Sequence, residues 1–271
     1  MRIFGFALGA FVWILLAVVL TAQQSATPTS QSSQAVAILQ RSLGLLAGGS
    51  AISDVTLTGT VRRLAGSDDE TGTAVLKALA TGEARMDLGL PSGQSSEVWK
   101  NSGNIQGVQA GQWTGRDGKS HAIALHNLVT DSSWFFPAMT LTRWLSIPGY
   151  AISLVGEESL NGETVEHITV SLLATTFPAD MSAMFQHLSR TEIYLDSASG
   201  LPAALAFNIH PDNDAVLDIP VEIRISDYRV VNGAQVPFHV ERYLNNVLFM
   251  DLHFNVVTLN TGLSAADFPI Q

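Results

Sequence analysis

The sequence predicts a mainly β domain with a few helices, of the α+β class. From Asp54 onward, β-branched residues alternate with polar residues at a period of two, which is typical of strands half-buried in a sheet. Turn-forming pairs recur along the rest of the chain, and Asn161-Gly162 and Asn232-Gly233 are the strongest of them. Two-residue turns of this kind join neighbouring antiparallel strands. We therefore expect an antiparallel meander that short helices interrupt.

The first residues are typical of an export signal. Arg2 precedes the apolar run Ile3–Leu20, and Ala22 ends the segment at a small residue. We expect a cleaved signal peptide over residues 1–22, although an uncleaved anchor helix is the alternative because the run approaches the length that spans a bilayer. No cysteine follows the run, so a lipid anchor of the bacterial type is excluded. The sequence predicts a periplasmic or secreted protein without a stable membrane anchor.

Composition excludes several classes of function. The chain has no cysteine, which removes disulfides, thiol catalysis and zinc sites built on cysteine. Its formal net charge is −10, and such a surface repels nucleic acids and anionic headgroups. No nucleotide or cofactor motif occurs, so we expect no cofactor. Since 46% of the residues are hydrophobic and 14% are charged, the domain has much apolar surface, which must be buried in a core or can contact a hydrophobic ligand.

The ordered part of the chain is predicted to start after a polar linker. Residues 23–33 are rich in Gln, Ser and Thr and are typical of a flexible tether. Gln34–Ala47 carries apolar residues at helical spacing, and Gly48-Gly49 ends this predicted helix. No internal repeat or second linker follows. We expect residues 34–271 to form a single β-rich domain.

The predicted strands lead to a final hairpin that is apolar on both faces. The clearest later strands are Glu163–Leu172, Thr191–Leu195, Val221–Tyr228, Gln235–Leu244 and Val247–Thr258. Pairing across a turn at residues 245 and 246 puts one apolar set on one face (Phe238, Val240, Val247, Phe249) and a second on the other (Tyr243, Leu248, Met250, Leu252, Phe254). A strand of this kind is covered on both sides or lines an apolar cavity.

Two segments break the strand pattern. Trp134–Leu145 and Pro178–Leu188 each hold several large apolar side chains at helical spacing, and the second opens with a proline. Both predict short amphipathic helices.

Three motifs in the last third of the chain have a recognisable order. Tyr194–Pro202 holds a strand, an Asp-x-x-[ST]-Gly-Leu-Pro turn and the start of the next strand, Ser226–Phe238 holds a strand pair, and Asn255–Phe268 holds a last strand and a closing segment. In these motifs the chain resembles the LolA-like lipoprotein-carrier superfamily. The resemblance implies a curved, unclosed antiparallel half-barrel whose apolar concave side is covered by helices and can hold acyl chains.

In such a fold, the two helical segments are the expected cover of an apolar cavity. We therefore predict that a hydrophobic ligand contacts their large side chains, namely Phe135, Phe136, Met139, Trp144, Met181, Met184 and Phe185.

The polar residues present no catalytic motif. His210, Asp212, Asp214 and Asp218 are spaced like cation ligands, but the glycine and closing glutamate of a calcium loop are missing, so we expect no metal site. His121 and His126 lack a zinc-binding pattern, and no G-x-S-x-G motif occurs. His239 with Glu241, and Asp251 with His253, share strand faces as on ordinary sheets.

The leading hypothesis is non-catalytic binding or carriage of a lipid or other hydrophobic molecule outside the cytoplasm. A structural or interaction module of the cell envelope, with a core filled by its own side chains, is the alternative. An unrecognised hydrolase is the third hypothesis. A cavity would distinguish the first from the second.

Overall fold

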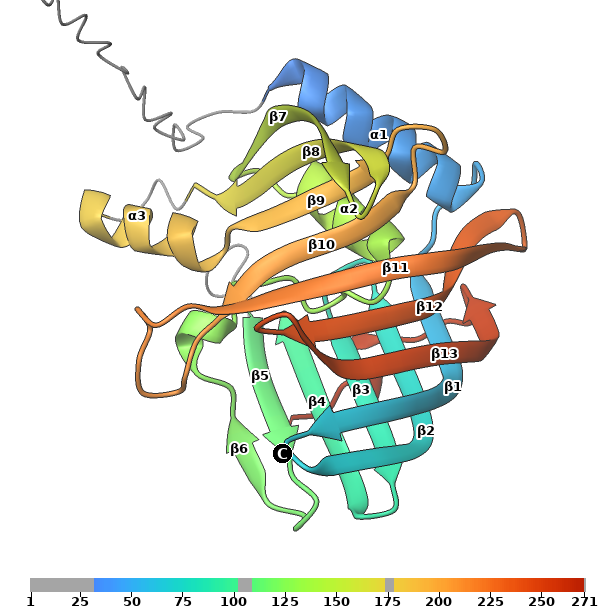
Figure 1. The fold of residues 1–271 in the computed structure, drawn as a ribbon, viewed down its shortest axis with the longest axis vertical. Coiled ribbons are helices and arrows are strands. Elements are labelled where there is room, and N and C mark those ends of the chain that lie inside the picture. Colours follow the sequence, from blue (N-terminus) through green and yellow to red (C-terminus); the bar gives the residue numbers. More distant parts are fainter. Residues whose placement is uncertain (1–31, 102–108, 174–177, 271) are drawn as a thin grey trace, which may run out of the picture.

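A computed structural model describes residues 32–101, 109–173 and 178–270. The predicted signal peptide, and the linker up to residue 31, lie outside the described residues. One antiparallel sheet of 13 strands dominates the fold (Figure 1), with the spatial order β6-β5-β4-β3-β2-β1-β13-β12-β11-β10-β9-β8-β7. The first meander has the strands β1 (Asp54–Ala65), β2 (Asp68–Leu79), β3 (Ala84–Leu90), β4 (Gly93–Asn101), β5 (Gln109–Thr114) and β6 (Ser120–Ala122).

The second meander follows two of the helices and returns the chain to the first strand. Its strands are β7 (Tyr150–Leu160), β8 (Glu163–Leu172), β9 (Thr191–Asp196), β10 (Pro202–Ile209), β11 (Ile219–Val231), β12 (Ala234–Leu244) and β13 (Val247–Leu259). The last strand, β13, pairs with the first, β1, whereas β6 and β7 are the two edges. The sheet is therefore curved and unclosed, as predicted (Figure 1).

Three α-helices cover the β7–β12 part of the sheet (Figure 1): α1 (Ser33–Ala47), α2 (Pro137–Ser146) and α3 (Ala179–Leu188). α1 packs against α2, β7 and β12, and α3 packs against β8. Two short 3-10 helices, η1 (Leu125–Asn127) and η2 (Ala265–Asp267), complete the described elements. The arrangement confirms the fold class, a mainly β half-barrel with helices over its concave side.

Local sequence signals explain the helix ends. Ser32 caps α1 by accepting a hydrogen bond from the Ala35 backbone N–H, and Gly48 ends the helix in the left-handed conformation. A side chain at Gly48 would collide with the carbonyl of Gly233, so the α1 end and the β11–β12 turn can meet only at glycine.

The second helix begins later than the sequence pattern predicts. α2 starts at Pro137, so Trp134, Phe135 and Phe136 precede it in a turn. Proline lacks a backbone N–H and fits the first turn of a helix, where that donor has no partner. The third helix agrees with prediction, because α3 starts directly after Pro178.

The final hairpin corrects one predicted face. A β-bulge between Arg242 and Tyr243 shifts the register of β12 against β13, so Val240 lies opposite Leu252 instead of sharing a face with Val247. Val247 is exposed, whereas Val240 and Leu252 are fully buried. A one-residue shift moves side chains to the opposite face, and the hydrophobic pattern of a two-faced strand does not reveal it.

Candidate functional site

Strand register brings two arginines to the inner face of the sheet. Arg63 on β1 and Arg242 on β12 both lie directly opposite Met250 on β13, and directly opposed residues share a face. Phe249 is the additional residue of the bulge, so Phe249 and Met250 both reach this inner face. The bulge therefore adds an aromatic ring beside the row Arg63, Met250 and Arg242.

A second row faces the first across the curved sheet. Glu97 on β4 lies opposite Met86 on β3 and opposite Trp113 on β5. The curl of the sheet brings β3, β4 and β5 behind β12, β13 and β1 (Figure 1). Glu97 is thus the acidic residue of one wall, and the two arginines belong to the other.

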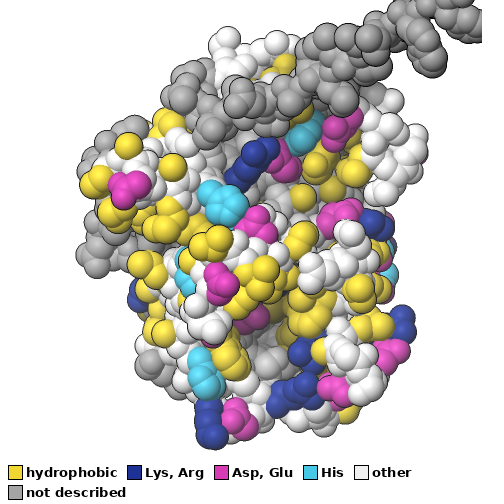
Figure 2. Space-filling view, turned by 60° about the vertical axis from the view of Figure 1, so that its left-hand side comes forward, with side chains coloured by type: hydrophobic (Ala, Val, Ile, Leu, Met, Phe, Trp, Pro, Cys, Tyr) yellow, Lys and Arg dark blue, Asp and Glu magenta, His cyan; other side chains and the backbone are white. Residues whose placement is uncertain are grey.

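Two cavities lie between these rows and meet at Glu97 and Trp113. The first has a volume of about 310 Å³ and is lined by Arg63, Met86, Leu88, Leu90, Ser95, Ser96, Glu97, Trp113, Thr114, Gly115, Arg116, Phe249 and Met250. The second has about 250 Å³ and is lined by Glu97, Trp99, Trp113, Ile123, Asn127, Thr130, Asp131, Trp134, Phe207, Ile209, His210, Asp212 and Arg242. We call the two cavities together the groove. Figure 2 shows one face of the molecule, on which hydrophobic side chains are interspersed with acidic and basic ones.

Both groove arginines lie over aromatic rings. The guanidinium carbon of Arg63 lies 5.3 Å from the ring centre of Phe249, and that of Arg242 lies 5.1 Å from the ring centre of Trp134. Arg63 Nη1 and Arg242 Nε are buried and have no hydrogen-bond acceptor among the described residues. A buried donor without an acceptor costs about 1–3 kcal/mol.

The environment of Glu97 weakens its ionised form. Burial raises the pKa of the Glu97 carboxyl, and the positive charges of Arg242 and Arg63 oppose that rise. Burial also lowers the pKa of Arg242, with Glu97 acting in the opposite direction. No ion pair within 4.0 Å joins Glu97 to either arginine in the described part of the chain.

The helical residues predicted to contact a ligand lie in two places. Large side chains of α2 and the preceding turn are fully buried in the main core: Phe135, Phe136, Met139 and Trp144. On α3, Phe185 is buried, whereas Met181 and Met184 are exposed. Within the described part of the chain, none of these seven side chains lines either cavity of the groove. Their contact with a ligand stays a prediction.

Trp134, the first residue of the predicted helical segment Trp134–Leu145, reaches the groove, although it is not among the seven side chains named as ligand contacts. Arg63, Glu97 and Arg242 were missed. Each is a charged residue at an inward position of a strand, which is the one sequence signal that could have found them.

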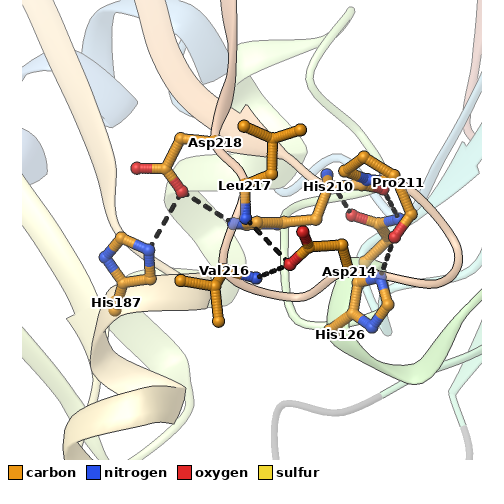
Figure 3. Close-up of polar contacts among 9 residues, drawn as sticks. His126, His187, His210, Pro211, Asp214, Val216, Leu217 and Asp218 are labelled. Atoms are coloured by element: carbon orange, nitrogen blue, oxygen red, sulfur yellow. Dashed lines mark hydrogen bonds and ion pairs between the residues drawn. The ribbon is translucent and has the colours of Figure 1, made fainter.

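The His210 loop forms a cluster with α3. Figure 3 shows His187 and His210 approaching the same carboxylate of Asp218, at distances of 3.0 and 2.9 Å from Nε2 to Oδ1. These ligand-type atoms lie within 4.8 Å of one another, so the cluster could hold a metal ion. His210 Nδ1, however, is buried without a hydrogen-bond partner, whereas metal-bound histidines usually donate their second ring N–H. The geometry fits a hydrogen-bonded anchor of α3 better than a metal centre.

The other acidic residues of this loop have separate roles. Asp214 accepts hydrogen bonds from the backbone N–H groups of Val216 and Leu217 and so stabilises the turn (Figure 3). Asp212 lines the groove. Of the four residues considered from the sequence, only His210 and Asp218 come together, and the third member, His187, comes from a distant helix.

Four other histidines, His121, His126, His239 and His253, form ordinary contacts near the surface. His121 stacks on Trp113 with ring centres 4.2 Å apart, and His126 Nε2 bonds the carbonyl of Pro211 at 2.9 Å. On the opposed strands β12 and β13, the rings of His239 and His253 are parallel within 8°, and both contact Asp251. Parallel rings do not converge on one ion, so this second cluster is a poor metal site.

Solved structures resemble the chain over most of its length, among them the following two. A domain from Vibrio parahaemolyticus named for outer-membrane lipoprotein sorting has a TM-score of 0.54 and 13% identity, covering 86% of this chain and 95% of its own. A LolA superfamily protein from Nitrosomonas europaea has a TM-score of 0.51 and 10% identity, covering 87% of this chain and 97% of its own. The fold is therefore LolA-like, as the turn motifs predicted.

Comparison of sequences adds no relative. No protein-family model matches the chain, and no curated protein is similar to it. Among the helices of the described residues, none has the length and hydropathy needed to cross a bilayer.

Proposed function

We propose that this protein binds a lipid or another hydrophobic molecule outside the cytoplasm and does not transform it. The observation that carries the proposal is the groove, whose two cavities lie on the inner face of the half-barrel and meet at Glu97 and Trp113. Beyond this meeting point the walls combine large apolar side chains, among them Leu88, Leu90 and Phe207, with polar and charged ones. A core filled by its own side chains would leave no such space, so the groove favours ligand binding over the structural alternative.

The structural likenesses support the same class of ligand. Both matched proteins are named for lipoprotein sorting or for the LolA superfamily, and the present chain shares their fold. Fold alone is a weak basis for activity. The proposal therefore depends on the groove, and the likenesses favour an acyl chain as its occupant.

Export and domain organisation complete the proposal. We propose that residues 1–22 are removed on export and that the predicted linker, residues 23–33, acts as a tether only up to Ser32, which already caps α1. The rest of the chain would work as one domain. The helices α2 and α3 would cover the concave side, with Met181 and Met184 as the side chains free to meet a ligand, since both are exposed. Intact-mass measurement of the exported protein tests the cleavage.

Binding of unbranched alcohols of increasing length tests the groove. Three of the five tryptophans, Trp99, Trp113 and Trp134, line the cavities, so occupancy should shift tryptophan emission saturably. Each buried methylene contributes about 0.8 kcal/mol, which corresponds to about a fourfold gain in affinity per carbon until the groove is filled.

A pair of neighbouring variants controls this experiment. Ser95→Phe places a ring in the first cavity, because Ser95 lies opposite the groove residue Leu88. Gln94→Phe adds the same ring at the next position, which is exposed and lines neither cavity of the groove. We expect the first variant to lose binding of long alcohols and the second to keep it. Absence of binding at every chain length would overturn the proposal in favour of the structural module.

A further inference from the structure

Two arginines differ from the other arginines of the described chain. Seven have a carboxylate partner, in the pairs Arg41–Glu166, Arg62–Asp69, Arg85–Asp87, Arg116–Glu70, Arg190–Glu192, Arg224–Glu222 and Arg229–Asp227. Arg143 interacts with Tyr150. Arg63 and Arg242 have neither a hydrogen bond nor an ion pair from their side chains to any described residue.

These two arginines also share one space. Both flank Met250, so their backbones are two strand spacings apart, or about 10 Å. Both act electrostatically on Glu97, where the two cavities meet. An anionic group placed near Glu97 is therefore within the field of both guanidinium groups.

Few acceptors lie near the two guanidinium groups. Each group carries a positive charge, and Glu97, the carboxylate on which both act, lies more than 4.0 Å from them. Asp131 and Asp212 also line the second cavity, but in the described part of the chain neither forms an ion pair with Arg242. The cation–π contacts of the two guanidinium groups with Phe249 and Trp134 supply no hydrogen-bond acceptor. A charged donor without an acceptor is costly unless a ligand supplies one.

We propose that the groove selects amphipathic molecules with one alkyl chain and one anionic head, whose oxygens accept hydrogen bonds from Arg63 and Arg242. This inference rests on the proposed function and names the ligand class for the same site. Carboxylate, sulfonate and phosphate-ester heads share the required chemistry. In the first cavity, the alkyl chain of the ligand would lie along Leu88, Leu90 and Phe249. In the second cavity, it would lie along apolar lining residues such as Phe207 and Ile209.

Glu97 makes the selection dependent on pH. An ionised Glu97 competes with the anionic head for the two arginines, whereas a protonated Glu97 does not. Burial raises the pKa of this carboxyl, so binding of an anion should strengthen as pH falls through that value. Other charged or titratable groups facing the space are Arg116, Asp131, His210 and Asp212. Arg116 is paired with Asp68 and Glu70, Asp131 accepts hydrogen bonds from Ser133 and Thr140, and His210 is bonded to Asp218.

Three probes that share a ten-carbon alkyl chain, called the ten-carbon probes and used below their micelle concentrations, distinguish the contribution of the head from that of the chain. Decane-1-sulfonate remains anionic over the whole working range of pH, decan-1-ol is neutral, and decyltrimethylammonium is cationic. By titration calorimetry at pH 7, we expect the sulfonate to bind at least tenfold more tightly than the alcohol and the cation to bind most weakly. Methanesulfonate, the head without a chain, should not displace decane-1-sulfonate at equal concentration.

Arginine variants test whether Arg63 and Arg242 bind the anionic head of the ligand. Arg63→Met and Arg242→Met each keep an apolar stem and remove the charge, and we expect each to weaken sulfonate binding about tenfold while leaving decan-1-ol binding unchanged. Arg85→Met is the matched control, because Arg85 neighbours Met86 on β3 but pairs with Asp87 and does not line the groove. It removes the same charge and should change sulfonate binding less than twofold.

Glu97→Gln provides a gain of binding that misfolding cannot imitate. We expect this variant to bind decane-1-sulfonate several-fold more tightly at pH 7 and to lose the dependence on pH. Equal affinities for all three ten-carbon probes, or Arg63→Met and Arg242→Met variants indistinguishable from Arg85→Met, would overturn this inference and leave the proposed function intact. Displacement by methanesulfonate would indicate a site for free anions instead. No binding of any ten-carbon probe would overturn the proposed function itself.

Discussion

Truncation of Phe136 to alanine tests whether the segment before α2 is core or cover. Phe136 has an exposed fraction of 0% and belongs to the main hydrophobic cluster. Removing a fully buried phenylalanine side chain leaves a cavity and costs about 3–5 kcal/mol. For a domain of this size each kcal/mol shifts the melting temperature by about 2–4 °C, so we expect a decrease of roughly 6–20 °C.

Urea unfolding and calorimetry at pH 7 measure this loss, with Met184→Ala as the matched control on α3. Met184 is 46% exposed, and we expect its truncation to change the free energy of unfolding by no more than about 0.5 kcal/mol. Binding of decan-1-ol is then measured on whichever fraction of each variant stays folded.

A specific result would refute this reasoning about burial. Suppose that the free energy of unfolding of Phe136→Ala lies within about 1 kcal/mol of the wild-type value and that the variant no longer binds decan-1-ol. Phe136 then belongs to a cover over the ligand. The sequence-based prediction that Phe136 and Trp144 contact a ligand would then be supported. A large loss of stability in both Phe136→Ala and Trp144→Ala, with binding retained by the folded fraction, would place both side chains in the core alone.

Three further predictions concern charged groups. Because burial raises the folded-state pKa of Glu97, ionising it opposes folding; we expect Glu97→Gln to be more stable than the wild type at pH 7, with the difference vanishing in urea titrations below the unfolded pKa of about 4.5. Burial alone would raise the pKa of Asp54, but hydrogen bonds from Thr261 and Gly262 lower it overall, to below 3.8. We therefore expect Asp54→Asn to lower the free energy of unfolding by about 2–3 kcal/mol at pH 7. This loss of stability should shrink as pH falls through the folded-state pKa of Asp54. Zinc or calcium should leave the melting temperature unchanged if His187 and Asp218 only anchor α3, and a saturable rise that a chelator reverses would contradict this.

Local chemistry explains why much of the fold was predictable. Asn161-Gly162 and Asn232-Gly233 adopt positive φ at their turns, and this conformation is the reason for the strength of these hairpin signals. Ser32 and Gly48 likewise bound α1 by capping. Turn and cap signals depend only on neighbouring residues, so they can be recognised in the sequence without knowing how the rest of the chain folds.

The site was less predictable, because it depends on register and curvature. The bulge at Phe249 decides that Val240 faces Leu252 and that two arginines flank Met250. A bulge depends on the pairing of two strands, and a strand that is apolar on both faces carries no pattern that reveals a one-residue shift.

The sequence by itself determined the class of fold, the positions of the turns and the apolar character of the last strands. It could not determine that β1 pairs with β13, or that Glu97, Arg63 and Arg242 meet in one groove. Those residues are 34 to 179 positions apart, and only the curl of a 13-stranded sheet brings them together. Turn preferences are local energies, whereas a groove is formed by the packing of the whole sheet, and for that reason the tertiary structure alone decided where the groove lies.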